Sequence, residues 1–190
     1  MSRLVTAFLD ANVLLPLPLA DFLLRAADAR LCRARWSADV QREWAHALSR
    51  QRPGADPRLL DARNAAMNAA LPDALVTGYA ALTATLSLPD ADDRHVLAAA
   101  IVGGADVIVT YNLRDFPARA LAKHGIKAQH PDAFLHGLIE RGPREFAAIA
   151  RQTIAAWCRP PVDIDDFFER LQRLRLHTAA AALRERFDAG

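Results

Sequence analysis

Two acidic residues follow apolar segments that are expected to form buried strands. Asp10 comes directly after the β-prone run Leu4–Leu9, and Asp115 lies shortly beyond a second such run, 106–110. The carboxyl ends of parallel strands share one edge of a sheet, where α/β proteins bind their ligands. The two acids are therefore predicted to lie near each other. Taken singly, each has a simpler role, because Asp10 could cap the next turn together with Asn12 and Asp115 could cap the next helix.

Two further acids lie on helix faces that are predicted to be buried. Glu43 follows Val40 at helical spacing and stands beside Trp44, and Asp93 heads the apolar stripe within 96–101. A buried carboxylate without a partner costs several kcal/mol or more. Each of these acids is therefore expected to meet a cation.

Ordinary explanations also exist for these helix acids. Glu43 considered alone would pair with an arginine such as Arg35 or Arg63. Asp90 would be the N-cap of the next helix, with Asp93 in its first turn, and each would gain about 0.3–1 kcal/mol from the helix dipole. That explanation does not account for the inward direction predicted for Asp93.

Considered together, the four carboxylates converge on one edge if the sheet is parallel. Unneutralised carboxylates a few ångströms apart repel one another and raise each other's pKa, so a bound divalent cation is the stable arrangement. All-oxygen ligands favour Mg²⁺ or Mn²⁺ over Zn²⁺. His95 is predicted to point off the buried stripe into solvent. The predicted metal ligands are Asp10, Glu43, Asp93 and Asp115.

The elements that must position these acids alternate between strand and helix, which favours a parallel α/β sheet. Ser37 is a candidate N-cap, and Gly103-Gly104 is a candidate helix stop. Strands are expected at Leu4–Leu9, at 106–110 and, more weakly, at 31–36. Helices are expected from Asp21, over 37–50, 59–71 and 73–82, and from the Asp90–Asp93 segment through Ile101.

Beyond about Gln129 the pattern is helical, over 144–159 and 165–187, with no convincing strand. There are too few heptads for a coiled coil, so these helices are expected to pack on the domain. The expected organisation is a domain over 1–130 and a helical C-terminal extension over 131–190. One face of the first helix is formed by Phe146, Ile149, Thr153, Ile154 and Trp157.

The composition is that of a globular protein, with 52% hydrophobic and 24% charged residues. A net charge of +2 excludes a domain that holds nucleic acid by bulk charge alone. Cys32 and Cys158 cannot form a disulfide scaffold or a structural zinc site and are expected to be buried. Neither a membrane span nor a secretory signal is found, so we expect a cytoplasmic protein without membrane contact.

Four segments contain the predicted ligands: FLDANV (8–13), WSADVQRE (36–43), LPDADDRHVLAAA (88–100) and VTYNLRDFP (109–117). In order and spacing they resemble the PIN domain family, specifically the bacterial PIN ribonucleases that act as toxins in toxin–antitoxin pairs (VapC-like). The resemblance covers roughly residues 3–130. It implies a three-layer α/β/α fold with a central parallel sheet.

The resemblance also implies an acidic metal site at the four predicted ligands. Asp90, Asp92 and Asp93 could each fill one family position, and Asp93 is preferred because it alone heads the apolar stripe. Supporting residues are Asn12, Thr110, Asn112 and Asp90. Nearby cations that could contact a nucleic-acid backbone, or simply be solvated, are Arg94, Arg114, Arg119 and Lys123.

By this resemblance the chain is expected to be a Mg²⁺- or Mn²⁺-dependent endoribonuclease and the toxin of a type II toxin–antitoxin pair. Its partners would be an RNA substrate and a protein antitoxin, and homodimers are common in the family. Alternatives are a catalytically silent PIN fold that serves binding or dimerisation, which the four intact acids argue against, and an RNA-processing nuclease that is not a toxin. A phosphotransfer or receiver domain with Asp10 as nucleophile would want a second acid beside it, but Asn12 stands two residues on.

Overall fold

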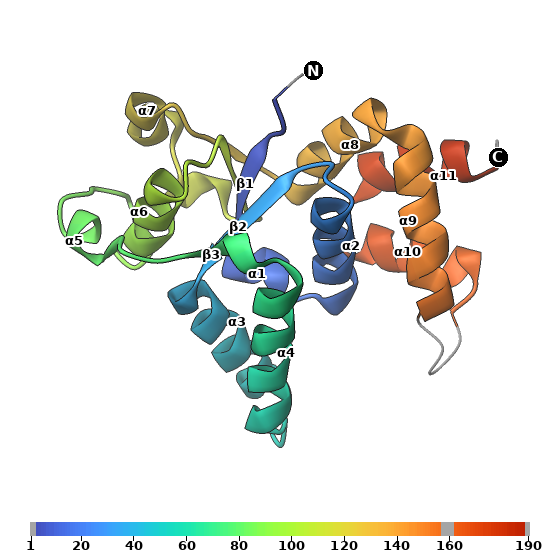
Figure 1. The fold of residues 1–190 in the computed structure, drawn as a ribbon, viewed down its shortest axis with the longest axis horizontal. Coiled ribbons are helices and arrows are strands. Elements are labelled where there is room, and N and C mark those ends of the chain that lie inside the picture. The colour runs from blue at the N-terminus through green and yellow to red at the C-terminus, as the bar shows by residue number, and fades with distance from the viewer. Residues whose placement is uncertain (1–2, 157–161, 189–190) are drawn as a thin grey trace.

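In the part of the chain that the computed structural model describes, residues 3–156 and 162–188, five strands form one parallel sheet. The strand order is β3-β2-β1-β4-β5, so β1 is central. The sheet runs through the middle of the molecule between helices (Figure 1). The strands are β1 (Thr6–Leu9), β2 (Arg33–Ser37), β3 (Leu75–Val76), β4 (Val107–Val109) and β5 (Lys127–Gln129).

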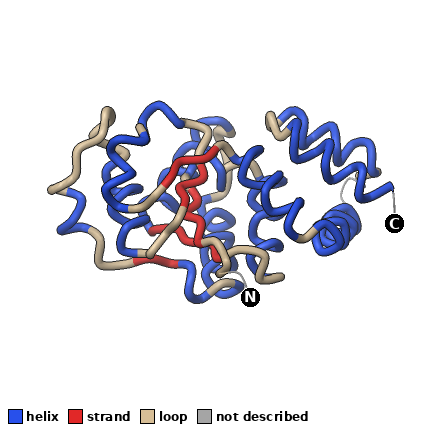
Figure 2. The backbone as a smooth tube through the Cα atoms, turned by 90° about the horizontal axis from the view of Figure 1, so that it is seen from above, coloured by secondary structure: helices blue, strands red, loops and turns tan. Residues whose placement is uncertain are grey.

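Helices cover both faces of the sheet, which confirms the predicted α/β/α arrangement with a central parallel sheet and a helical C-terminal region (Figure 2). The helices of the sheet domain are α1 (Ala11–Leu14), α2 (Leu17–Asp28), α3 (Ala38–Gln51), α4 (Pro57–Ala70), α5 (Ala80–Thr83), α6 (Arg94–Val102) and α7 (Ala118–Leu121), with 3-10 turns η1 (Pro72–Ala74), η2 (Leu113–Asp115) and η3 (Ala122–His124). The C-terminal helices are α8 (Pro131–Arg141), α9 (Pro143–Ala156), α10 (Ile164–Arg173) and α11 (His177–Asp188).

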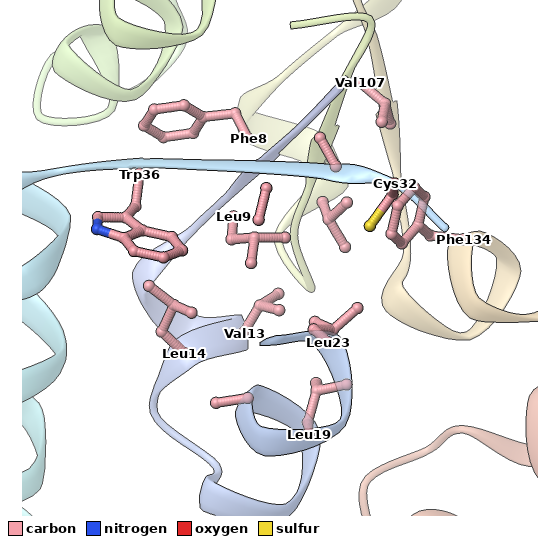
Figure 3. Close-up of a cluster of buried hydrophobic side chains, with 14 of the residues drawn as sticks. Phe8, Leu9, Val13, Leu14, Leu19, Leu23, Cys32, Trp36, Val107 and Phe134 are labelled. Atoms are coloured by element: carbon pink, nitrogen blue, oxygen red, sulfur yellow. The ribbon is translucent and has the colours of Figure 1, made fainter. Parts of the chain in front are cut away.

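The core lies on both sides of the central strand. Every residue of β1 is buried, as expected for a strand covered on two faces. Successive side chains of a strand point to opposite faces, and Figure 3 shows Phe8 and Leu9 on opposite sides of the sheet. Leu9 meets the apolar side chains of the helices that follow, among them Val13 and Leu23 (Figure 3).

The helix predicted over 73–82 is wrong. The segment forms η1, the two-residue strand β3 and the start of α5 instead. Leu75 and Val76 pair with Trp36 and Ser37, so cross-strand pairing overrides local helix propensity and adds the edge strand. The end of α6 packs tightly here, since a Cβ on Gly103 would lie 2.8 Å from the Val76 side chain.

The other boundaries follow local chemistry. Ser37 caps α3 as predicted, because its hydroxyl accepts the Val40 amide at 3.2 Å. The α2 helix begins earlier than expected, at Leu17, because Pro18 can stand in a first helical turn, where no amide donor is needed. The stretch 165–187, expected to be continuous, is split between α10 and α11 at Arg175, whose φ of 58° cannot continue a helix.

The C-terminal helices pack on α2 through aromatic side chains. The ring of Phe22 lies 5.6 Å from that of Phe146 in α9 and 6.1 Å from that of Phe167 in α10. On the predicted α9 face, Phe146, Ile149 and Thr153 are buried and Ile154 is half-buried, while Trp157 lies outside the described residues. The α8 helix lies within the predicted helical extension over 131–190, although no helix was placed at those residues, and the short edge strand β5 was not predicted.

None of the helices in the described ranges is long and apolar enough to cross a bilayer. Cys32 is buried, and burial raises the pKa of its thiol to about 12. It therefore behaves as a small apolar side chain, as predicted. Cys158 lies outside the described residues.

Candidate functional site

Asp10 sits at the carboxyl edge of the sheet because of the strand register. Leu9 pairs with Val109, so the next residue of each strand, Asp10 and Thr110, emerge side by side. The Asp10 amide continues the ladder by donating to the Val109 carbonyl at 3.1 Å. The Asp10 carboxylate then lies against the first residues of α1.

Three donors fix the Asp10 carboxylate. Its Oδ1 accepts the Ala11 amide at 2.6 Å, and its Oδ2 accepts the Thr110 hydroxyl at 2.6 Å and the Asn12 amide Nδ2 at 2.7 Å. Burial raises the pKa of Asp10 although the bonds from Thr110 and Ala11 act to lower it, and the charge of Glu43 raises it further. Asp10 therefore caps α1, and it is also rigidly held and electrostatically coupled to another acid.

Asp93, Asp115 and Asp90 form a carboxylate cluster. One oxygen from each lies within 4.8 Å of the others. They come from the N-cap position of α6, from η2, and from the loop before α6. The Asn112 side-chain amide donates to Asp115, and the Thr110 hydroxyl accepts the Asn112 amide N–H at 2.9 Å, so the loop after β4 is held to the strand end.

The pKa of Asp93 reports the crowding of these acids. Burial, and after it the charges of Asp10, Asp115 and Asp90 in that order, together raise it from 3.8 to about 7 against a small opposing effect of His95. Such mutual repulsion is relieved either by a proton or by a bound cation. Oxygen donors at this spacing suit a hard divalent ion, so the side chains present fit a metal site.

Glu43 lies differently from its prediction. It is on the exposed side of α3, with a side chain 45% exposed, because the buried stripe of that helix is narrow and follows Val40 and Trp44. Its partner is neither Arg35 nor Arg63 but His95, whose Nε2 lies 2.7 Å from Glu43 Oε1.

His95 is the site residue that the sequence analysis placed wrongly in solvent. Its side chain is only 16% exposed. Burial alone would lower its pKa, but the hydrogen bond and charge of Glu43 outweigh burial, so the pKa of His95 is raised. A signal was available in the sequence, because 96–102 are all apolar, and a helix that is apolar around its circumference is expected to be buried, which brings its first-turn side chains close to neighbouring elements.

Asp90, Asp115 and the nearby cations do not all take the roles predicted for them. Asp90 does not cap α6, since its carboxylate accepts the Asp92 amide at 2.9 Å and Asp93 occupies the N-cap position. Asp115 caps no helix either, because Pro117 precedes α7. Among the nearby cations, Arg114, Arg119 and Lys123 are exposed, whereas Arg94 is half-buried and its Nε has no hydrogen-bond partner among the described residues.

The arrangement gathers the predicted acids at one end of the sheet in two groups. Asp93 and Asp115 share the cluster with Asp90. Asp10 and Glu43 lie outside that cluster and couple to one another, and Asp10 also couples to Asp93. The chemistry that such an edge allows is the binding of a divalent cation by carboxylate oxygens.

Both parts of the chain resemble known proteins. The family model described as PIN domain matches residues 6–114, and the model described as VapC50 C-terminal domain matches residues 131–185. A protein of Mycobacterium tuberculosis (strain ATCC 25618 / H37Rv) named "Putative ribonuclease VapC50" is 38% identical over 98 residues, which are 52% of this chain and 57% of that protein. The alignment thus spans little more than half of the relative. No solved structure matches the chain. Because the PIN domain model matches more than half of its length, the chain belongs to the PIN domain family.

Proposed function

We propose that this protein is a divalent-metal-dependent endoribonuclease and the toxin of a type II toxin–antitoxin pair. The observation that carries the proposal is the cluster of Asp90, Asp93 and Asp115 beside the buried Asp10, at the ligand-binding edge of a PIN-family sheet. The name of the Mycobacterium relative, a ribonuclease, supports the substrate class.

The proposed ligands of Mg²⁺ or Mn²⁺ are Asp10, Glu43, Asp93 and Asp115. Asn12 and Thr110 hold the Asp10 carboxylate by hydrogen bonds, Asn112 holds Asp115, and Asp90 adds negative charge to the cluster. When bound, such an ion can activate a water and stabilise charge on the oxygens of a phosphodiester.

The remaining task of the site is to hold an anionic RNA backbone near acids that repel it. Arg114 stands next to Asp115 in the sequence and is exposed, as are Arg119 and Lys123 a few residues further along the chain. Exposed arginine and lysine side chains can neutralise backbone phosphates. We therefore assign contact with the RNA backbone to Arg114, Arg119 and Lys123.

Cleavage of a mixed RNA pool tests the proposal. Wild type should cleave with Mn²⁺ or Mg²⁺ and not with EDTA. Asp93→Asn should lose at least about 100-fold of the activity, because removing even an outer partner of a metal ligand costs 10–100-fold. The matched control is Asp21→Asn, a half-buried aspartate paired with Arg25 on α2, which should retain activity. Cleavage that persists in EDTA and in Asp93→Asn would exclude the mechanism.

The toxin role is tested separately. Induced expression in a bacterial host should arrest growth with wild type and not with Asp93→Asn, and co-expression of the product of the neighbouring gene, as a candidate antitoxin, should restore growth. RNA cleavage without growth arrest would leave a nuclease that serves RNA processing. Light scattering of the purified protein would report whether it is the homodimer expected from its family.

A further inference from the structure

Tyr111 lies between the candidate site and the C-terminal helices. Its hydroxyl donates to the Leu174 carbonyl at 2.7 Å, and its ring packs edge-on against that of His130, with centroids 4.9 Å apart and an interplanar angle of 88°. Burial raises the pKa of Tyr111 to about 12, so the hydroxyl remains a donor at neutral pH. This residue directly follows Thr110, which holds Asp10.

On its other side, Tyr111 is joined to the site by its backbone. Its amide donates to Asn12 Oδ1 at 3.1 Å, and Asn12 Nδ2 donates to Asp10 Oδ2 at 2.7 Å. A series of hydrogen bonds thus connects the Leu174 carbonyl to the buried Asp10 carboxylate through Tyr111 and Asn12.

The C-terminal end of this path is itself fixed. Leu174 caps α10, and the turn that follows is closed by the Leu176 amide on the Leu171 carbonyl at 3.0 Å. The carboxylate of Asp132 in α8 accepts the Ala179 amide at the start of α11, at 2.8 Å. Three helices therefore hold the acceptor that the Tyr111 hydroxyl uses.

We propose that the C-terminal helices α8, α10 and α11 position the 110–115 segment, and through Asn12 the Asp10 carboxylate, by way of Tyr111. Tyr111 is then a positioning residue for the site, and the C-terminal region contributes to metal binding without supplying a ligand. The predicted effect on metal affinity rests on the proposed function. The positioning of the 110–115 segment can be measured without metal.

The test is Tyr111→Phe, which keeps the ring and removes the hydroxyl. Amides of 110–112 should exchange hydrogen faster in the metal-free variant, and Mn²⁺ affinity, measured by the EPR signal of free Mn²⁺, should fall about threefold to tenfold, less than for a direct partner of a ligand. The matched control is Thr153→Val, which removes a buried hydroxyl that donates to the Ile149 carbonyl at 2.9 Å in α9. It should change neither quantity, even where it lowers stability equally.

A second variant tests the C-terminal end of this series of hydrogen bonds. Asp132→Ala removes the carboxylate that holds the start of α11, and it should also speed exchange at 110–112 if the C-terminal helices act through Leu174. Unchanged exchange and unchanged Mn²⁺ affinity in Tyr111→Phe would overturn the inference while leaving the proposed nuclease intact. Faster exchange in a protein whose wild type binds no Mn²⁺ would support the positioning and reject the metal-dependent function.

Discussion

Of the described helices that have an aspartate at the N-cap position, α10 and α6 use it differently. At α10, in the C-terminal region, the Asp163 carboxylate accepts the Asp166 amide at 2.8 Å, as a capping residue does. At α6, in the candidate site, Asp93 makes no such bond and faces three other carboxylates instead. One aspartate stabilises its helix, while the other leaves its oxygens available at a cost in repulsion. Position in a helix therefore does not decide what an acid does; its surroundings across the fold do.

The largest effect expected from this comparison concerns His95. His95→Ala should weaken Mn²⁺ binding about tenfold, because outer partners of metal ligands contribute 10–100-fold and His95 holds Glu43 from 2.7 Å. Calorimetric titration of Mn²⁺ measures it, and His95→Gln, which can still donate, should recover part of the loss. The control is His46→Ala, an exposed histidine on α3. Equal affinities for wild type and His95→Ala would remove Glu43 from the ligand set.

A smaller effect is expected at the capping aspartate. Asp163→Ala should lower the free energy of unfolding by about 1 kcal/mol, since it removes a helix cap, which for a chain of this size shifts Tm by roughly 2–4 °C. Thermal unfolding measures the change, and Asp163→Ser should restore most of it. Mn²⁺ affinity should stay at the wild-type value. A loss of metal binding here would mean that the two N-termini are not functionally distinct.

The smallest effect is a pH dependence of stability at Asp93. Because the folded pKa, about 7, lies above 3.8, the folded protein retains a proton that the unfolded chain releases. The proton on Asp93 therefore stabilises the folded protein, and this stabilisation is fully present below about pH 3.8 and is lost as pH rises through about 7. In EDTA, Asp93→Asn should therefore gain stability relative to wild type between about pH 5 and 8, by no more than about 1 kcal/mol because water screens the cluster. A difference that does not change with pH would contradict the crowding of the acids.

Local chemistry made much of the fold predictable. The apolar run before Asp10 specified β1, the hydroxyl of Ser37 specified the start of α3, and Gly103 ended α6. These features depend on residues within a few positions of one another. By contrast, β3 and β5 have two and three residues and exist through pairing with β2 and β4, so no periodicity within them could reveal them.

The candidate site, like the fold, was predictable only in part from local sequence. The types and order of the acids in the chain were enough to nominate Asp10, Glu43, Asp93 and Asp115 as ligands, and that nomination remains a prediction. The expected neighbours were less accurate, because Glu43 was assigned to a buried face and His95 to solvent. Helical spacing gives the direction of a side chain only to within part of a turn, and a residue at the edge of a stripe can lie on either side.

The sequence by itself determined the alternation of strands and helices, the acids that follow the strands, and the family to which these belong, because each depends on residue types at short range. Only the tertiary structure decided that Asp90 joins Asp93 and Asp115, that Glu43 meets His95, and that Tyr111 connects the site to α10. These contacts join residues brought together by strand register and helix packing, and no local pattern specifies a distance across the fold.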